Sequence, residues 1–170
     1  MKIVTLEKFV EKSLEFSTLN LINECFSENR PCLGDESELA MRVIAMDHEN
    51  VISHAAMYIR SMRIDDYTFK GSIIGDVVVS RNYRGRGLCK IMLDVLNSFN
   101  FELKIEHSFL FAYEPKIYLS CGYRNLTNEI KFFDSNCNEW KKFVYKGGLH
   151  KQIGNSKLPD GVIDFCGKVY

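Results

Sequence analysis

Apolar residues between positions 88 and 99 recur at intervals of three and four residues. They fall at Leu88, Ile91, Met92, Val95, Leu96 and Phe99. This spacing forms one continuous apolar stripe and predicts an amphipathic helix. Residues 6–29 also carry apolar side chains at mixed helical spacings, so we expect one or two helices there.

A different pattern fills the middle of the chain. Three largely apolar segments, residues 41–46, 51–62 and 67–80, are separated by short polar turns, the second of which contains Asp65 and Asp66. Strands joined by tight polar turns need no crossover helices, so these segments predict an antiparallel meander. We expect further strands at residues 2–5, 107–113, 129–134 and 140–145.

Turn signals divide the remainder of the chain. Glu114-Pro115 predicts the start of a short helix, with proline at the first helical position and Gly122 as the C-terminal cap. Pro159, Asp160 and Gly161 predict a turn before a short apolar end. The order of elements indicates an α+β fold with a mixed, largely antiparallel central sheet flanked by helices.

Length and charge narrow the class of protein. A chain of 170 residues fits one domain with a sizeable core. Lys plus Arg and Asp plus Glu are equal at 22 each, which argues against nucleic acid as a partner. The first residues lack the apolar core of a signal peptide, and no apolar run reaches the roughly 20 residues of a membrane span. We therefore expect a cytoplasmic protein that does not bind a membrane.

The cysteines do not suggest a metal centre. No CxxC pair is present and the chain has only four histidines, so we expect no metal site. In a reducing compartment the cysteines are expected to be free thiols that pack as small apolar residues. They are Cys25, Cys32, Cys89, Cys121, Cys137 and Cys166.

The segment Arg84-Gly85-Arg86-Gly87 stands between the third strand of the meander and the amphipathic helix. The first turn of a helix has N–H groups without helical partners and a partial positive charge. Glycines let an anion approach those groups closely, and arginines add charge at the rim, so the segment could hold a pyrophosphate. The spacing differs from both GxGxxG and the P-loop, and the preceding strand belongs to a meander rather than a β-α-β unit.

The stretch "DVVVSRNYRGRGLCKIML" resembles the acetyl-CoA-binding motif of the GCN5-related N-acetyltransferases, the GNAT family. That motif has Arg or Gln, two residues, Gly, one residue, then Gly or Ala, after a strand that ends in Val. Arg84, Gly87 and Cys89 take these places after Val79, and Cys89 departs from the usual Gly or Ala. The resemblance covers residues 40–125 and implies acetyl-CoA as cosubstrate.

The resemblance also implies how the cosubstrate is held. The backbone of the last strand residues would pair with the pantetheine arm, and the amides of the loop would bind the pyrophosphate. The strand residues are Val77, Val78 and Val79, and the loop residues are Arg84, Gly85, Arg86, Gly87, Leu88 and Cys89.

A second motif follows at the expected distance. "KIYLSCGYRN" resembles the FY-x-x-x-GF motif of the same family and places Tyr118 at the tyrosine that protonates the departing thiolate. A phenol with a pKa of about 10 can donate a proton as negative charge develops on sulfur. The alternative is that Tyr118 is a core aromatic on a short helix.

The acceptor amine must lose a proton before it attacks, so carboxylates near it are of interest. Asp76 is out of phase with Val77 and Val79, and it either touches the acceptor or pairs with an arginine. Glu114 is a further candidate, although capping the short helix is the simpler role. We expect His54 to make a structural hydrogen bond, and His107 is a weaker candidate base.

The C-terminus adds a third carboxylate. Residues 167–170, Gly-Lys-Val-Tyr, resemble the Gly-x-Val-Trp terminus of the aminoglycoside 2′-N-acetyltransferases, whose terminal carboxylate enters the acceptor site. By this resemblance Tyr170 would orient a cationic amine. The stretch "LPDGVID" also resembles the end of the nodulation N-acyltransferases, which share this fold.

Together these observations predict one acyl-CoA N-acyltransferase domain over residues 1–170. Its core is residues 40–125, and residues 134–170 complete the acceptor site. The predicted reaction moves an acetyl group from acetyl-CoA to a primary amine of a small molecule, by direct attack in a ternary complex. Transfer of a longer acyl chain, a non-catalytic acyl-CoA sensor and an interaction module with a degenerate cofactor site are alternatives. Many members of the family are dimers, so a homodimer stays open.

Overall fold

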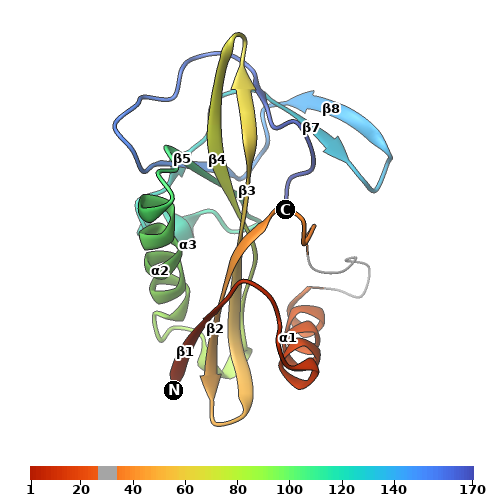
Figure 1. Ribbon diagram of the computed structural model, residues 1–170, viewed down its shortest axis with the longest axis vertical. Helices are drawn as coiled ribbons and strands as arrows, with labels where there is room; N and C mark the ends of the chain where they lie inside the picture. The colour runs from red at the N-terminus through yellow and green to blue at the C-terminus, as the bar shows by residue number, and fades with distance from the viewer. Residues whose placement is uncertain (27–33) are drawn as a thin grey trace. The chain divides into compact units, whose positions relative to one another are not determined.

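The structure is a computed structural model that describes residues 1–26 and 34–170. The chain divides into two compact units: Met1–Tyr58 with Gly75–Ser98, and Ile59–Ile74 with Phe99–Tyr170. Strands β3 (Asn50–Ile64) and β4 (Tyr67–Val79) contribute residues to both units. The mixed α+β fold with a largely antiparallel sheet is confirmed (Figure 1).

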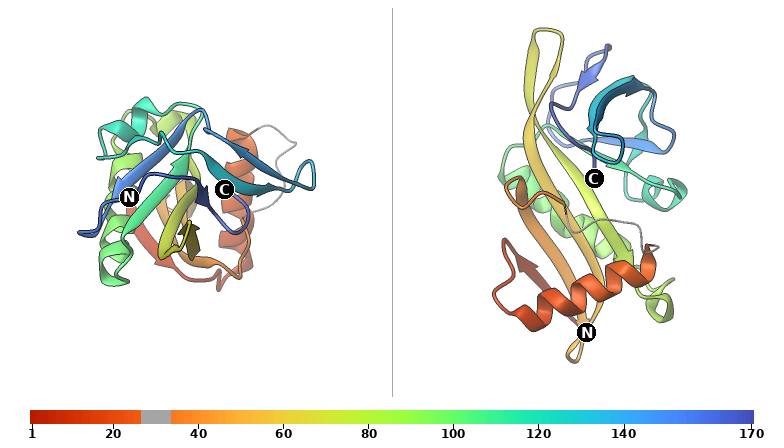
Figure 2. Two further views of the ribbon diagram at one scale, coloured as in Figure 1. Left: turned by 90° about the horizontal axis from the view of Figure 1, so that it is seen from above. Right: turned by 90° about the vertical axis from the view of Figure 1, so that its right-hand side faces the viewer.

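The first unit is built on antiparallel strands. Its β1 pairs with β2, and β2 pairs with β3 in a register that sets Ile44 opposite His54. Leu21 of helix α1 packs against Ile44 on one face, while Leu88 of helix α2 packs with Ala45 on the other. Figures 1 and 2 show α1 and α2 on opposite sides of β2 and β3. The other elements of this unit are β1 (Lys2–Leu6), α1 (Lys12–Cys25), β2 (Leu39–Asp47), the 3₁₀ turn η1 (Arg81–Tyr83) and most of α2 (Leu88–Glu102).

In the second unit, hydrogen-bonded strands follow the order β6-β9-β5-β4-β3-β10-β7-β8. The pairs β4 with β5 and β10 with β7 are parallel. The pairs β5 with β9, β6 with β9, β10 with β3 and β7 with β8 are antiparallel. Its elements are β5 (His107–Phe111), α3 (Lys116–Leu119), β6 (Arg124–Asn125), β7 (Ile130–Asp134), β8 (Glu139–Phe143), β9 (Gly148–Gln152) and β10 (Ile163–Asp164).

For β4, the strand before the glycine loop, the sequence predicted a place in an antiparallel meander only. Besides its place beside β3, β4 pairs in parallel with β5 through Ile73 opposite Phe109. The amphipathic helix α2 connects the two strands, so the prediction that β4 stands outside a β-α-β unit was wrong. Two parallel neighbours require such a crossover, because a tight turn can join only antiparallel strands.

The N-terminal helix is shorter than its apolar pattern suggested. Residues 7–11 are not helical, and residues 27–29 lie outside the described part of the chain. Phe9 precedes the helix but still packs against the cluster of Leu21 and Ile44. Its side chain is apolar because it is part of the core, and that requirement does not depend on helical backbone.

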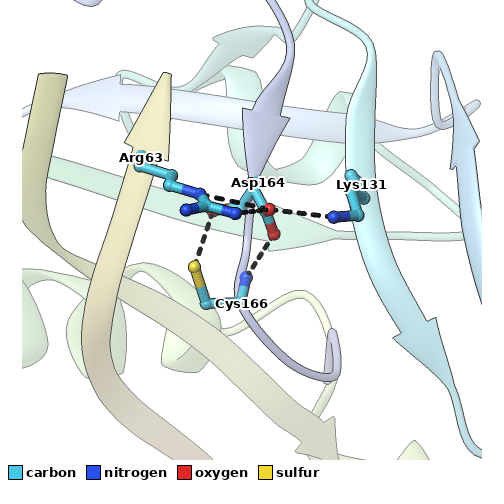
Figure 3. Close-up of polar contacts among 4 residues, drawn as sticks. All are labelled: Arg63, Lys131, Asp164 and Cys166. Carbon is cyan, nitrogen blue, oxygen red and sulfur yellow. Dashed lines mark hydrogen bonds and ion pairs between the residues drawn. The ribbon is translucent and has the colours of Figure 1, made fainter. Parts of the chain in front are cut away.

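Strand β10 has only two residues and is anchored by charge (Figure 3). The carboxylate of Asp164 accepts hydrogen bonds from Arg63 of β3 at 3.1 Å and Lys131 of β7 at 3.2 Å. The Cys166 N–H donates to the other carboxylate oxygen at 2.9 Å. Burial acts to raise the pKa of Asp164, but these donors outweigh it and leave the pKa below its usual value.

Two further expectations concern thiols and membranes. The cysteines at 25, 89, 121, 137 and 166 are free, as predicted, and Cys32 lies outside the described residues. Within the part of the chain that the structure describes, no helix has the length and apolar character needed to cross a membrane.

Candidate active site

The glycine loop connects β4 to α2 within the first unit. Gly85 and Gly87 have φ angles of 75° and 77°, in the left-handed region that side-chain-bearing residues rarely adopt. A Cβ atom placed on either glycine would meet no other atom within 4 Å, so the space above the backbone is open. The Ile91 N–H donates to the Gly87 carbonyl at 3.1 Å, which starts the helix directly after the loop. This arrangement suits an anion at a helix N-terminus.

Both arginines of the loop are exposed and held by neighbouring backbone. Arg84 Nε donates to the Val79 carbonyl at 3.1 Å, and Arg86 Nη2 donates to the Asn82 carbonyl at 3.2 Å. The Arg86 guanidinium lies 4.9 Å from the centre of the Tyr83 ring. Their charge therefore stays beside the open glycines. Residues that bind a phosphate need this combination of fixed position and accessible charge.

The valines that end β4 differ in burial. Val78 is 3% exposed and packs in the cluster on the α1 side, whereas Val79 packs with Leu88 on the other side. Val77 is half-buried. The side chains at the end of β4 thus alternate between the two faces of the sheet, as predicted. Because the side chains point to the faces, a ligand arm laid along the edge of the strand would meet backbone groups.

Asp76 stands just before these valines, with a φ of 52°. Its carboxylate accepts hydrogen bonds from the Tyr58 hydroxyl at 2.6 Å and the Gly34 N–H at 3.4 Å. Its carbonyl lies 2.9 Å from His54 Nδ1. A positive φ in a residue other than glycine costs about 1–3 kcal/mol, and contacts on both sides of the residue support it.

Burial sets the protonation of the groups around Asp76. It lowers the pKa of His54 to about 4, so the imidazole is neutral near pH 7 and its Nδ1–H donates to the Asp76 carbonyl. The structural hydrogen bond expected for His54 is confirmed. Burial and the charge of Asp76 raise the pKa of Tyr58 well above its usual value, so the phenol keeps its proton. Side-chain periodicity does not reveal this pair, because Tyr58 and Asp76 are 18 residues apart in the sequence.

Tyr118 belongs to the second unit. It lies on α3 and is half-buried. Its carbonyl accepts from the Cys121 N–H at 2.9 Å. The C-cap of α3 is Ser120, and Gly122, which the sequence predicted as the cap, follows two residues later with a φ of 86°. Pro115 is the N-cap of α3, one position before its predicted place, and no side chain caps this helix. Glu114 therefore does not act as the cap, although its carbonyl accepts from the Ile117 N–H at 3.4 Å.

The C-terminal residues are also part of the second unit. The Tyr170 hydroxyl lies 3.1 Å from Arg60 Nη2, and the guanidinium is 5.5 Å from the centre of the ring. Arg60 Nη1 donates to the Phe165 carbonyl at 3.2 Å, and the Phe133 N–H donates to the Gly167 carbonyl at 2.8 Å. The tail is therefore held by strands β3 and β7 rather than extending freely.

His107 and His150 face each other across β5 and β9. His107 Nδ1 and His150 Nε2 are 3.2 Å apart, so one donates and the other accepts. Burial lowers the pKa of His107 and lowers that of His150 to about 4, with the charge of His107 acting in the same direction on His150. Both imidazoles are neutral near pH 7. The role of His107 as a base stays a prediction that rests on the sequence.

These depressed pKa values predict that stability falls in mild acid. The unfolded chain binds protons at histidine near pH 6.5, whereas the folded chain resists binding until about pH 4. The free energy of unfolding should therefore decrease as pH falls from 7 to 4, by roughly 3 kcal/mol for His150 alone. Urea titrations at four pH values measure this slope. His150→Phe should make the slope shallower, and an unchanged slope would contradict the assignment.

Comparison with known proteins settles the family. Residues 10–126 match the family model described as an acetyltransferase (GNAT) domain. The chain belongs to the GNAT acetyltransferase family. This confirms the resemblance drawn from the loop motif, and with it the expected class of enzyme, an acyltransferase. Among curated proteins, none matches the sequence.

Solved structures show the same GNAT fold. The GNAT family N-acetyltransferase YhbS from Escherichia coli, in complex with CoA, has a TM-score of 0.67 at 12% identity, over 96% of this chain and 88% of that protein. A GNAT acetyltransferase from Staphylococcus aureus has a TM-score of 0.60 at 18% identity, over 90% of this chain and 100% of that protein.

A third neighbour is much longer than this chain. It is a probable N-acyltransferase from Enterococcus faecalis, with a TM-score of 0.61 and 16% identity over 76% of this chain. The chain spans only 34% of that protein. The likeness therefore concerns one part of the longer protein.

Proposed function

We propose that this GNAT protein transfers an acetyl group from acetyl-CoA to a primary amine of a small molecule. The observation that carries the proposal is the open loop at Gly85 and Gly87, with exposed Arg84 and Arg86, at the start of α2. Its geometry fits a pyrophosphate, and the similar Escherichia coli protein has been solved with CoA. We further propose that residues 1–170 act as one domain, with residues 134–170 serving the acceptor.

The residues proposed to hold the cosubstrate are those of the β4–α2 connection. The backbone of Val77 to Val79 would pair with the pantetheine arm, and the amides from Arg84 to Cys89 would bind the pyrophosphate. Cys89 stands where the family has Gly or Ala, and its side chain is half-buried. When bound, acetyl-CoA supplies the activated acyl group as a thioester.

The proposed chemistry needs an acid and a way to receive the amine. Tyr118 would give its proton to the thiolate that leaves. Asp76 and the terminal carboxylate of Tyr170 would attract the cationic amine. After the amine gives a proton to a base or a chain of water molecules, it attacks the thioester directly in a ternary complex. No covalent enzyme intermediate is required.

Calorimetric titration with acetyl-CoA, with desulfo-CoA as a control, tests the cosubstrate site. We expect binding in the micromolar range and a loss of about 100-fold or more when Arg84 and Gly87 are replaced together by Ala, because the change removes a cation and a left-handed glycine. The variant should still fold and melt only a few degrees lower, because alanine at the left-handed Gly87 costs about 1 kcal/mol. Equal affinity of the two proteins would refute the proposed cradle.

Removal of Val169 and Tyr170 tests the tail. The carboxylate would move away from its proposed place, so the KM for the amine should rise about tenfold while the KM for acetyl-CoA stays unchanged. Tyr170→Phe is the matched control, since it removes the contact of the hydroxyl with Arg60 but keeps the carboxylate. An unchanged amine KM in the truncated protein would exclude this role.

A further inference from the structure

Arg42 is a buried cation in the first unit whose charge is poorly balanced. It is 0% exposed, and its Nε and Nη1 atoms have no hydrogen-bond partner among the residues that the structure describes. Its Nη2 lies 3.4 Å from a carboxylate oxygen of Glu36, and the guanidinium is 4.7 Å from the centre of the Phe9 ring. A guanidinium presents five N–H donors, and burial without acceptors is unfavourable.

Glu36 shows which kind of group reaches this cation. Its side chain is 62% exposed, yet its carboxylate contacts Arg42 Nη2. A carboxylate can therefore approach the guanidinium from the solvent side. The single long contact leaves the two-pronged pairing that a guanidinium makes with a carboxylate unformed.

Arg42 lies on the same face of the sheet as the groups around Asp76. Arg42 is opposite Ala56, and His54 and Tyr58 stand two residues to either side of Ala56 on β3, with side chains on one face. Burial has the largest effect on the pKa of His54 and of Tyr58; on each of them the charge of Asp76 acts to raise the pKa and the charge of Arg42 acts to lower it. A cation and a carboxylate thus act on the same two side chains.

We infer that the amine acceptor is a zwitterion of the amino-acid type, whose carboxylate binds Arg42 in place of Glu36 while its ammonium group is drawn to Asp76. The inference rests on the proposed acetyl transfer for the role of the ligand, but not for its binding. A buried arginine that lacks a full partner and a nearby buried carboxylate match the two charges of such a molecule. A simple amine would leave Arg42 as it is.

The experiment compares amino acids with their decarboxylated counterparts. The pairs are alanine with ethylamine, lysine with 1,5-diaminopentane, and phenylalanine with 2-phenylethylamine, each titrated against the full chain by calorimetry. We expect at least one amino acid to bind roughly tenfold or more tightly than its counterpart, because only the acid can pair with Arg42. Equal or weaker binding of the acid in all three pairs would overturn the inference.

Two variants of opposite expected effect examine the contact itself. Arg42→Met keeps an apolar stem against Phe9 and should abolish the preference for the acid, while its melting temperature stays the same or rises because a buried charge is removed. Glu36→Gln removes the competing carboxylate and should tighten binding of the acid several-fold. A preference that survives in Arg42→Met would assign the acid group to another residue and refute the inference.

Turnover assays separate this inference from the proposed function. If the amino acids bind but are not acetylated, and acetyl-CoA does not bind, the transferase proposal fails while the zwitterion site stands. If simple amines are acetylated as fast as amino acids and bind as well, the transferase proposal stands and the zwitterion site is refuted.

Discussion

Tyr118→Phe is expected to lower kcat by about 100-fold to 1000-fold and to leave the affinity for acetyl-CoA nearly unchanged. General acid catalysis contributes about this much to a rate, and phenylalanine keeps the ring while it removes the proton donor. Tyr118 is half-buried on α3, its N–H donates to the Pro115 carbonyl, and its carbonyl accepts from the Cys121 N–H. The substitution leaves these backbone bonds in place and should not alter the fold. Steady-state kinetics and calorimetry provide the two measurements.

Tyr113 offers a matched control in the same segment. It is 95% exposed, so Tyr113→Phe should leave both kcat and binding as they are. Turnover by Tyr118→Phe at the original rate would show that another group, or water, protonates the thiolate. If the original protein binds acetyl-CoA but shows no turnover, the result would favour the non-catalytic acyl-CoA sensor.

Gly147→Ala is expected to reduce the free energy of unfolding by about 3 kcal/mol or more. Gly147 has a φ of 85°, and a Cβ atom there would collide with the carbonyl oxygen of Ala112. The same backbone segments are joined by the Ala112 N–H, which donates to the Gly147 carbonyl at 3.0 Å, so they cannot separate without losing this bond. Backbone strain and overlap therefore add at one position.

Gly85→Ala separates the two causes. Gly85 has a similar φ of 75°, but an added Cβ would meet no atom within 4 Å, so only the strain of about 1 kcal/mol applies. Urea unfolding followed by circular dichroism compares the variants. Equal losses of stability would show that the segments around Ala112 and Gly147 move apart at little cost.

The sequence predicted most of the regular elements because their patterns are local. The stripe from Leu88 to Phe99 and the paired strands β2 and β3 follow from side-chain periodicity alone. Strand β9 was missed because Gly148–Gln152 contains glycine and polar residues, and because its partner β5 lies far earlier in the sequence. Ser108 of β5, for example, is opposite Lys151 of β9, 43 positions later. Periodicity does not report a pairing of that kind.

The residues of the candidate site also form two groups, one that is local in the sequence and one that only the fold brings together. Gly85, Gly87 and the two arginines are contiguous, so their role could be predicted from a short motif. The cluster of Arg42, His54, Tyr58 and Asp76 could not, because three strands contribute to it and each residue by itself resembles an ordinary strand residue. Only the folded chain shows that these polar groups share one buried face.

Two separate requirements apply to the residue at position 76: its backbone is left-handed, and the proposed site needs a charge on its side chain. Asparagine, aspartate and glycine tolerate this conformation better than most other residues, so the backbone favours these three amino acids at position 76. Asparagine would keep the shape of the chain and an acceptor for the Tyr58 hydroxyl, but it has no charge to attract an amine. Glycine would keep only the shape. Among these three residues, aspartate alone combines a tolerated left-handed backbone with the charge that the proposed amine site requires.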